Sequence, residues 1–137
     1  MKQAYLALAF LITVFLLAGN AYGEDEVYYC ADIDRNGFSY DKKGQSYERS
    51  GFKARKFKLK LDNVSGRVDI VEEPFRRIEY TCTPLNISDP HILSCVDGVS
   101  YLIFNTNNGK FTLAAMAGYV AHDSDSVSVS YGTCDKF

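Results

Sequence analysis

The chain has 137 residues, with 17 acidic against 15 basic side chains and a formal net charge of −2. This slightly acidic balance predicts no nucleic-acid partner, because binding to phosphate backbones depends on an excess of positive charge. The length suits one small domain. Tryptophan is absent, whereas ten tyrosines and nine phenylalanines favour β-strands.

The first 23 residues have the pattern of a secretion signal. Met1-Lys2 supplies a positive start, and residues 4–19 form an apolar run broken only by Thr13. Ala21-Tyr22-Gly23 then places small residues where a signal peptidase reads them, just ahead of acidic Glu24. A spanning helix needs about 20 apolar residues, which is more than this run provides, so we favour cleavage over an uncleaved membrane anchor.

Cleavage would leave residues 24–137 as a single domain that is periplasmic or secreted. No later stretch is apolar enough to span a membrane. An exported chain meets an oxidising compartment, where cysteines form disulfides.

The chain's four cysteines, Cys30, Cys82, Cys95 and Cys134, are therefore disulfide candidates. They allow three pairings, of which we favour Cys30–Cys134 with Cys82–Cys95. Cys82 and Cys95 end neighbouring predicted strands, and the other pair would join the first strand to the last. A structural zinc site is not expected, because the chain has no C-x-x-C motif.

Alternating apolar and polar residues predict strands throughout the mature chain. β-Branched and aromatic residues open it at 27–31, and the pattern returns at 56–61, 68–70 and 78–82. Within 56–61, Phe57, Leu59 and Leu61 alternate with three lysines. Phe52 and Ala54 have the opposite parity from Phe57, which predicts a bulge or bend near Arg55.

Asp97-Gly98 and Asn108-Gly109 predict two hairpins, because both central positions of the favoured two-residue turns need positive φ. Pairing across the first turn sets Cys95 against Ser100, and pairing across the second sets Phe104 against Leu113. One face would then contribute the core residues Leu93, Cys95, Leu102, Phe104, Phe111, Leu113 and Ala115. Val127, Val129 and Tyr131 alternate with Ser126, Ser128 and Ser130 in a last, half-exposed strand.

These elements predict an all-β fold. No helical period lasts longer than a turn or two in the mature domain. An antiparallel meander of about eight strands, closing into a small barrel or a flattened sandwich with two disulfides, accounts for the pattern.

A run of basic residues is the clearest surface feature. Six of them occur with no acidic residue between the first and the last: Arg49, Lys53, Arg55, Lys56, Lys58 and Lys60. Such a stripe can hold an anionic envelope component or an acidic protein surface. The alternative is a sheet-edge strand that its lysines protect from aggregation.

The segment that begins at Asp32 matches the first half of a calcium loop. Oxygen-bearing side chains recur at Asp32, Asp34 and Asn36, and a glycine follows at Gly37. The twelfth position of such a loop should be a bidentate glutamate, but Lys43 stands there. A polar turn is the alternative that we favour, and we expect no metal or other cofactor.

The two histidines offer little support for an enzyme. His91 and His122 both lie in turn-like settings, and a small hydrolase would need a loop site around His122, Asp123 and Asp89. No G-x-S-x-G motif is present to expose a serine nucleophile. We therefore expect a non-catalytic binding domain and keep the periplasmic hydrolase as an alternative.

Several short motifs resemble those of small uncharacterised secreted proteins of marine bacteria. They are Tyr28-Tyr29-Cys30, Gly37-Phe38, Phe52 through Phe57-Lys58, and the ending Tyr131-Gly132-Thr133-Cys134-Asp135-Lys136-Phe137. That resemblance implies a type of host and no activity. The early Tyr-x-Cys is also similar to that of periplasmic inhibitors of C-type lysozyme. This second resemblance implies a lysozyme-inhibitor-like barrel, with Ser50-Gly51 as the counterpart of the family's inhibitory loop.

Overall fold

The computed structural model describes residues 25–72, 76–121 and 126–137. The predicted signal peptide and its cleavage site lie outside these residues. The strands are β1 (Glu26–Asp41), β2 (Ser46–Gly51), β3 (Lys56–Asp62), β4 (Arg67–Glu72), β5 (Arg76–Asn86), β6 (Asp89–Val96), β7 (Ser100–Asn105), β8 (Lys110–Ala115) and β9 (Val127–Lys136). A four-residue helix, α2 (Gly118–Ala121), lies between β8 and β9.

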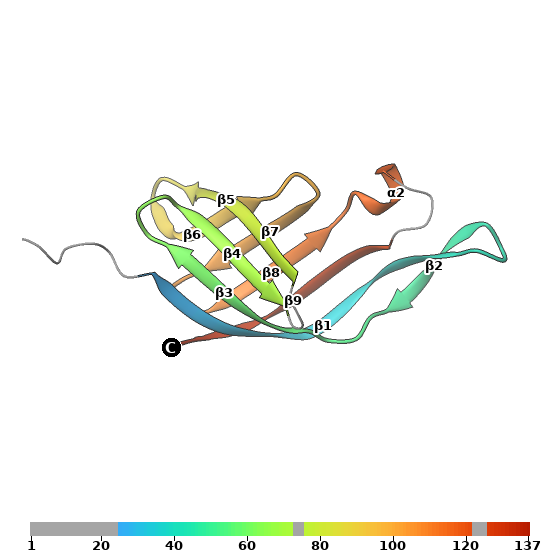
Figure 1. Cartoon of the computed structure of the whole chain (residues 1–137), viewed down its shortest axis with the longest axis horizontal. Coiled ribbons are helices and arrows are strands. Elements are labelled where there is room, and N and C mark those ends of the chain that lie inside the picture. The colour runs from blue at the N-terminus through green and yellow to red at the C-terminus, as the bar shows by residue number, and fades with distance from the viewer. Residues whose placement is uncertain (1–24, 73–75, 122–125) are drawn as a thin grey trace, which may run out of the picture.

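The strands form one antiparallel sheet that closes on itself (Figure 1). The order is β2-β1-β3-β4-β5-β6-β7-β8-β9, and β9 pairs back with β1. Eight strands thus make a barrel, and β2 is a ninth strand paired with the second half of β1. The β1–β2 ribbon extends beyond the barrel. The predicted all-β barrel is confirmed, as is the predicted break near Arg55, because β2 ends at Gly51 and β3 begins at Lys56.

Both predicted disulfides are confirmed. Cys30 and Cys134 are register partners in β1 and β9, so their disulfide joins the strands that close the barrel. Cys82 and Cys95 are register partners across the β5–β6 hairpin. The first bond links residues 104 positions apart and the second links residues 13 apart.

The barrel interior is the hydrophobic core, and every strand of the barrel contributes alternate residues to it. Its buried members are Tyr28, Cys30, Phe57, Leu59, Leu61, Val68, Ile70, Tyr80, Cys95, Leu102, Phe104, Phe111, Leu113 and Cys134. Of the predicted core face, Leu93 packs at its margin and Ala115 is only partly buried. Edge-to-face ring contacts, such as Tyr28 against Phe104 at 4.9 Å between centroids, fix the packing.

The predicted registers of the two hairpins are wrong by two residues. Cys95 pairs with Leu102, and Phe104 pairs with Phe111. In the first hairpin the Asp97 carboxylate accepts the N–H groups of the two residues that follow Gly98, so Gly98 and its successor form the turn. In the second, the loop takes four residues. A shift of two preserves side-chain parity, so the core face is still the predicted one.

Two glycines allow β9 to approach β1 closely. A Cβ on Gly37 would lie 2.0 Å from the carbonyl oxygen of Val127, and one on Gly132 would lie 2.0 Å from that of Ala31. No other residue type fits without moving the backbone. The seam between the first and last strands therefore depends on both glycines as well as on the disulfide.

Candidate functional site

The predicted basic strand is β3, and its lysines face outward. Lys56, Lys58 and Lys60 are exposed and alternate with buried Phe57 and Leu59. β3 pairs with β1 on one side and with β4 on the other. The interpretation of these lysines as guards of a sheet edge is wrong, because closure of the barrel leaves β3 with no free edge.

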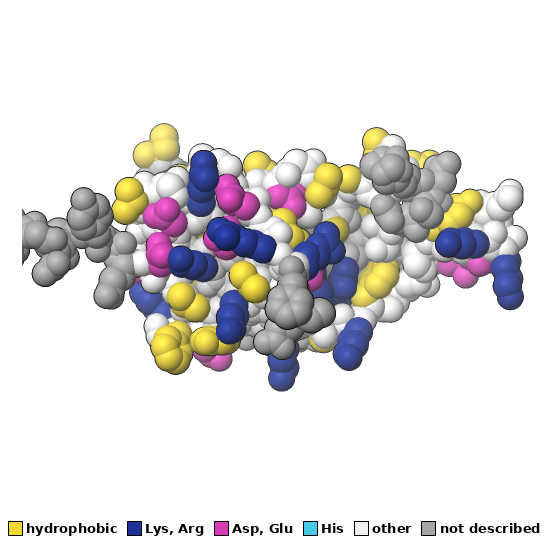
Figure 2. Space-filling view, in the orientation of Figure 1, with side chains coloured by type: hydrophobic (Ala, Val, Ile, Leu, Met, Phe, Trp, Pro, Cys, Tyr) yellow, Lys and Arg dark blue, Asp and Glu magenta, His cyan; other side chains and the backbone are white. Residues whose placement is uncertain are grey.

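The three lysines differ in how well they are neutralised. Lys60 Nζ lies 2.6 Å from Asp25 Oδ2, and this hydrogen bond and charge raise the pKa of the Lys60 ammonium. Further ion pairs join β4 to β5, and acidic side chains accordingly lie among the basic ones over these strands in Figure 2. Among the described residues, Lys56 and Lys58 form no ion pair.

An open groove of about 520 Å³ runs along the outer face beside these two lysines. Its floor and walls are Tyr29, Cys30, Ala31, Lys56, Phe57, Lys58, Val71 and Asp135. Lys58 Nζ lies 5.5 Å from the centroid of the Tyr29 ring, which also contacts Phe137 edge to face at 5.8 Å. Tyr29 is 46% exposed and Phe137 is 91% exposed. Cationic and aromatic groups thus share one surface, which we call the β3 face.

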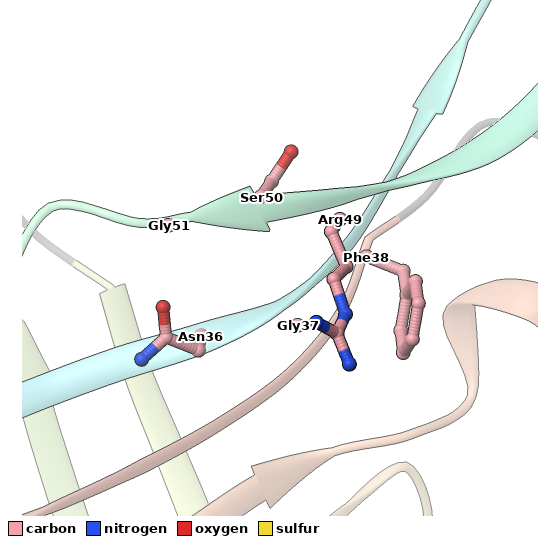
Figure 3. Close-up of a pocket in the computed structure, with 6 residues that line it drawn as sticks. All are labelled: Asn36, Gly37, Phe38, Arg49, Ser50 and Gly51. Carbon is pink, nitrogen blue, oxygen red and sulfur yellow. The ribbon is translucent and has the colours of Figure 1, made fainter.

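The other predicted basic residues lie elsewhere. Lys53 is exposed in the link before β3. Arg49 is on β2, opposite Phe38 of β1, in an open groove of about 460 Å³ that Asn36, Gly37, Ser50 and Gly51 complete. Figure 3 shows Arg49 and Phe38 on one side of the ribbon and Ser50 on the other.

Arg55 does not belong to the outer stripe, because its side chain turns into the barrel. Its backbone N–H and its Nε both donate to Asp32 Oδ2, each at 3.0 Å. Nη1 donates to Glu72 Oε1 at 2.9 Å, and Nη2 donates to Ser130 Oγ at 3.1 Å. The buried Asp32 carboxylate requires a cation, and Arg55 supplies it.

The structure separates the residues that a calcium loop would bring together. Asp32 points inward to Arg55, and a bulge between Asp32 and Asp34 places Asp34 on the outside. There the Asp34 carboxylate accepts hydrogen bonds from Asn36 Nδ2 at 2.6 Å and from the Arg35 N–H at 2.8 Å. Within the described ranges, no three acidic, histidine or cysteine side chains are grouped in a way that suits a metal ion.

Polar side chains fill one end of the barrel interior, which the sequence did not lead us to expect. Ser128 and Ser130 of β9 are buried, at 3% and 1% exposure, whereas Val129 and Tyr131 face solvent. Arg35 donates from Nη2 to Ser128 Oγ at 3.2 Å, and its guanidinium lies 5.0 Å from the Phe52 ring centroid. The position of Cys134 could have predicted this. Side chains at alternate positions of a strand share a face, so an inward Cys134 requires Ser128 and Ser130 to face inward too.

The histidine positions give the hydrolase hypothesis no assembled site. His91 is exposed near the start of β6, and its backbone N–H donates to Asp89 Oδ1 at 3.2 Å. His122 and Asp123 lie outside the described residues, so their part in such a site stays a prediction. The β5–β6 connection, near His91, is at the opposite end of the barrel from α2 (Figure 1).

No family model, curated protein or solved structure matches this chain. The class of the molecule therefore follows from its structure: it is a closed antiparallel barrel held by two disulfides. The disulfides indicate an oxidising, extracellular type of compartment. No helix in the described part of the chain is long and apolar enough to cross a membrane.

Proposed function

We propose that the chain is an exported, non-catalytic domain that binds an anionic surface through the β3 face, with phospholipid headgroups as the ligand class. The observation that carries the proposal is the pair of exposed lysines, Lys56 and Lys58, beside the half-exposed Tyr29 ring. The apolar run of residues 4–19, ahead of the predicted cleavage site, and the two disulfides support a periplasmic or secreted location.

The chemistry of the β3 face suits a headgroup layer. Lysine side chains near an anionic leaflet contribute about 1 kcal/mol each, so Lys56 and Lys58 together contribute about 2 kcal/mol. Tyrosine side chains are favoured at the depth of the lipid headgroups, because the ring is apolar and the hydroxyl group is polar. In Figure 2 apolar side chains gather close to the C-terminal end of the chain, beside basic ones.

Other groups limit the strength of this attraction. Asp135 lines the groove. Lys136 forms an ion pair with Glu26, with Nζ 2.9 Å from Oε1. The available charge is therefore that of two lysines rather than of the whole basic run. We expect reversible binding that weakens as salt screens the charges.

Cosedimentation with phospholipid vesicles tests this proposal. The mature domain is mixed with vesicles of phosphatidylglycerol and phosphatidylcholine, and with vesicles of phosphatidylcholine alone, at about 10 mM and about 150 mM salt, where the Debye length falls from about 30 Å to about 8 Å. We expect binding to the anionic vesicles at low salt. Loss of about 2 kcal/mol predicts that K56A/K58A partitions about 30-fold more weakly.

The control variant K42A/K43A removes two exposed lysines from the turn between β1 and β2 and changes the net charge equally. We expect it to partition like the wild type. Equal weakening of both double variants would show that net charge, and not the β3 face, determines binding. No difference between K56A/K58A and wild type would refute the proposal outright.

Inhibition of C-type lysozyme is a second candidate function. It is favoured by one observation: Ser50 and Gly51, the residues that resemble the inhibitory loop, line the open groove of the β1–β2 ribbon (Figure 3). An assay of cell-wall lysis by hen egg-white lysozyme, with and without the mature domain, tests it. Stoichiometric inhibition that is lost in S50A would support this function, and unchanged lysis would exclude it.

A further inference from the structure

The polar end of the barrel interior contains a small cavity of about 70 Å³. It is lined by Arg35, Arg55, Ile70, Glu72, Arg76, Ile78, Tyr80, Ser100, Leu113, Ala115 and Ser128. We propose that this cavity binds a small oxyanion, with Arg35 as the principal cation and Arg76 at the rim. This site is separate from the β3 face, so either proposal can fail while the other holds.

Arg35 has an incomplete set of partners. Its Nη2 donates to Ser128 Oγ, but its Nε is buried and has no hydrogen-bond partner. Among the described residues, no carboxylate forms an ion pair with it. A buried donor left without an acceptor is costly, and an oxygen of a bound anion would remove that cost.

Among the described residues, the charges around the cavity leave a positive excess. Asp32 and Glu72 are both directed at Arg55, which they neutralise. Together with Arg35 and Arg76, these five groups carry three positive and two negative charges, a sum of +1. Burial, followed by repulsion from Arg55, lowers the pKa of the Arg35 guanidinium, although Asp32 and Glu72 oppose the shift. A bound anion would stabilise the charged form of the guanidinium and so offset both effects.

The shape and the remaining lining indicate the size and chemistry of the ligand. The lining includes three residues with hydroxyl groups, Tyr80, Ser100 and Ser128, and a hydroxyl can donate a hydrogen bond to an anion oxygen. A water molecule occupies about 30 Å³ of liquid, so the cavity admits a group of only a few heavy atoms. Carboxylate and phosphate groups fit this description and match the geometry of guanidinium donors. The ligand is a free small oxyanion or the anionic end of a larger molecule.

Nuclear magnetic resonance titration of the isotopically labelled mature domain tests the site. Inorganic phosphate and acetate are the two probes, added at constant ionic strength set with chloride. We expect a saturable shift of the Arg35 Nε–H signal with at least one probe, and the probe that binds more tightly identifies the class of oxyanion, phosphate or carboxylate. No saturable shift of this signal with either probe would overturn the proposal.

Variants then locate the binding. R35Q should weaken the affinity for the preferred probe at least tenfold, and R76Q, which changes an exposed side chain, should weaken it about threefold. R67Q is the matched control, because Arg67 is an exposed arginine paired with Glu79 on the outside of the barrel. If R76Q and R67Q have the same effect, the binding is not in this cavity, even where R35Q fails to fold.

Discussion

Replacement of Arg55 by methionine should destabilise the barrel strongly. The Asp32 side chain is 0% exposed, and two of its hydrogen bonds come from Arg55, one from the backbone N–H and one from Nε. Its second oxygen, Oδ1, has no partner in the described structure. R55M keeps the backbone donor but leaves a buried carboxylate without a cation. Such a loss costs about 3–5 kcal/mol in the free energy of unfolding.

The matched control is R67M. Arg67 and Glu79 form an ion pair of similar length, 3.1 Å, but their side chains are 60% and 51% exposed. Exposed pairs contribute about 0–1 kcal/mol, so R67M should change stability by no more than this. D32N in the R55M background should recover part of the loss, because a buried amide costs less than a buried carboxylate.

Urea unfolding followed by far-ultraviolet circular dichroism, with the disulfides intact, measures these differences. The chain has no tryptophan, so intrinsic fluorescence would report only on tyrosine. The expected order of stability is wild type close to R67M, then D32N/R55M, then R55M. Equal changes for R55M and R67M would refute the claim that Arg55 is the internal partner of a buried acid.

Three further perturbations test the barrel. G132A should cost several kcal/mol, because the new Cβ would lie 2.0 Å from a backbone oxygen of β1, and overpacking of a rigid interior costs about 1–3 kcal/mol or more; thermal unfolding measures it. Removal of the β1–β9 disulfide, which spans 104 residues, should lower the free energy of unfolding by about 4.7 kcal/mol in the loop-entropy model. Removal of the β5–β6 disulfide, which spans 13, should lower it by about 3 kcal/mol. Urea unfolding of the variants with both cysteines of a pair replaced by alanine measures each loss. A hydrogen bond from Tyr28, followed by one from Lys136, lowers the pKa of the Glu26 carboxyl. Glu26 therefore stabilises the fold above its unfolded pKa, and this stabilisation is lost as the pH falls through its folded pKa. E26Q should flatten the acid limb of a curve of stability against pH.

Each of these perturbations has an internal comparison. G51A adds a methyl group 3.6 Å from the nearest atom, an Asn36 side-chain oxygen, so it should leave stability nearly unchanged. If G51A and G132A behave alike, the close approach of β1 and β9 is wrong. A larger effect from the shorter disulfide would contradict the loop-entropy argument. An acid limb that E26Q does not alter would exclude Glu26 as a contributor.

Much of the fold was predictable because its signals are local. Alternation of Phe57, Leu59 and Leu61 with lysines indicates a strand with one buried face whatever its neighbours are. The cysteine pairing followed from the expected strand order. The sequence left open whether the lysines of residues 56–60 protect a free sheet edge. Closure of the barrel excludes this, because it gives β3 a neighbouring strand on each side.

The polar interior was not predictable from alternation alone. In β9 the apolar residues Val129 and Tyr131 face solvent and the serines face inward, so the usual assignment of faces is reversed. The bulge between Asp32 and Asp34 changes which later residues of β1 point inward, and no local pattern marks it. The inward turn of Arg55 depends on Asp32 of β1 and Glu72 of β4, which are distant from it in the sequence. The hairpin registers differ because the first turn lies one residue later than predicted and the second loop is longer, and side chains at both turns, those of Asp97 and Asn105, accept backbone N–H groups.

The most direct test of the proposed binding surface is residue-resolved. Amide signals of the labelled mature domain are followed as nanodiscs containing phosphatidylglycerol and a paramagnetic lipid are added at low salt. We expect the signals of Tyr29, Lys56, Lys58 and Val71 to broaden first, whereas those of Lys42 and Lys43 persist. Broadening that begins at the β1–β2 turn, or that is uniform over the barrel, would contradict the claim that the β3 face holds an anionic surface.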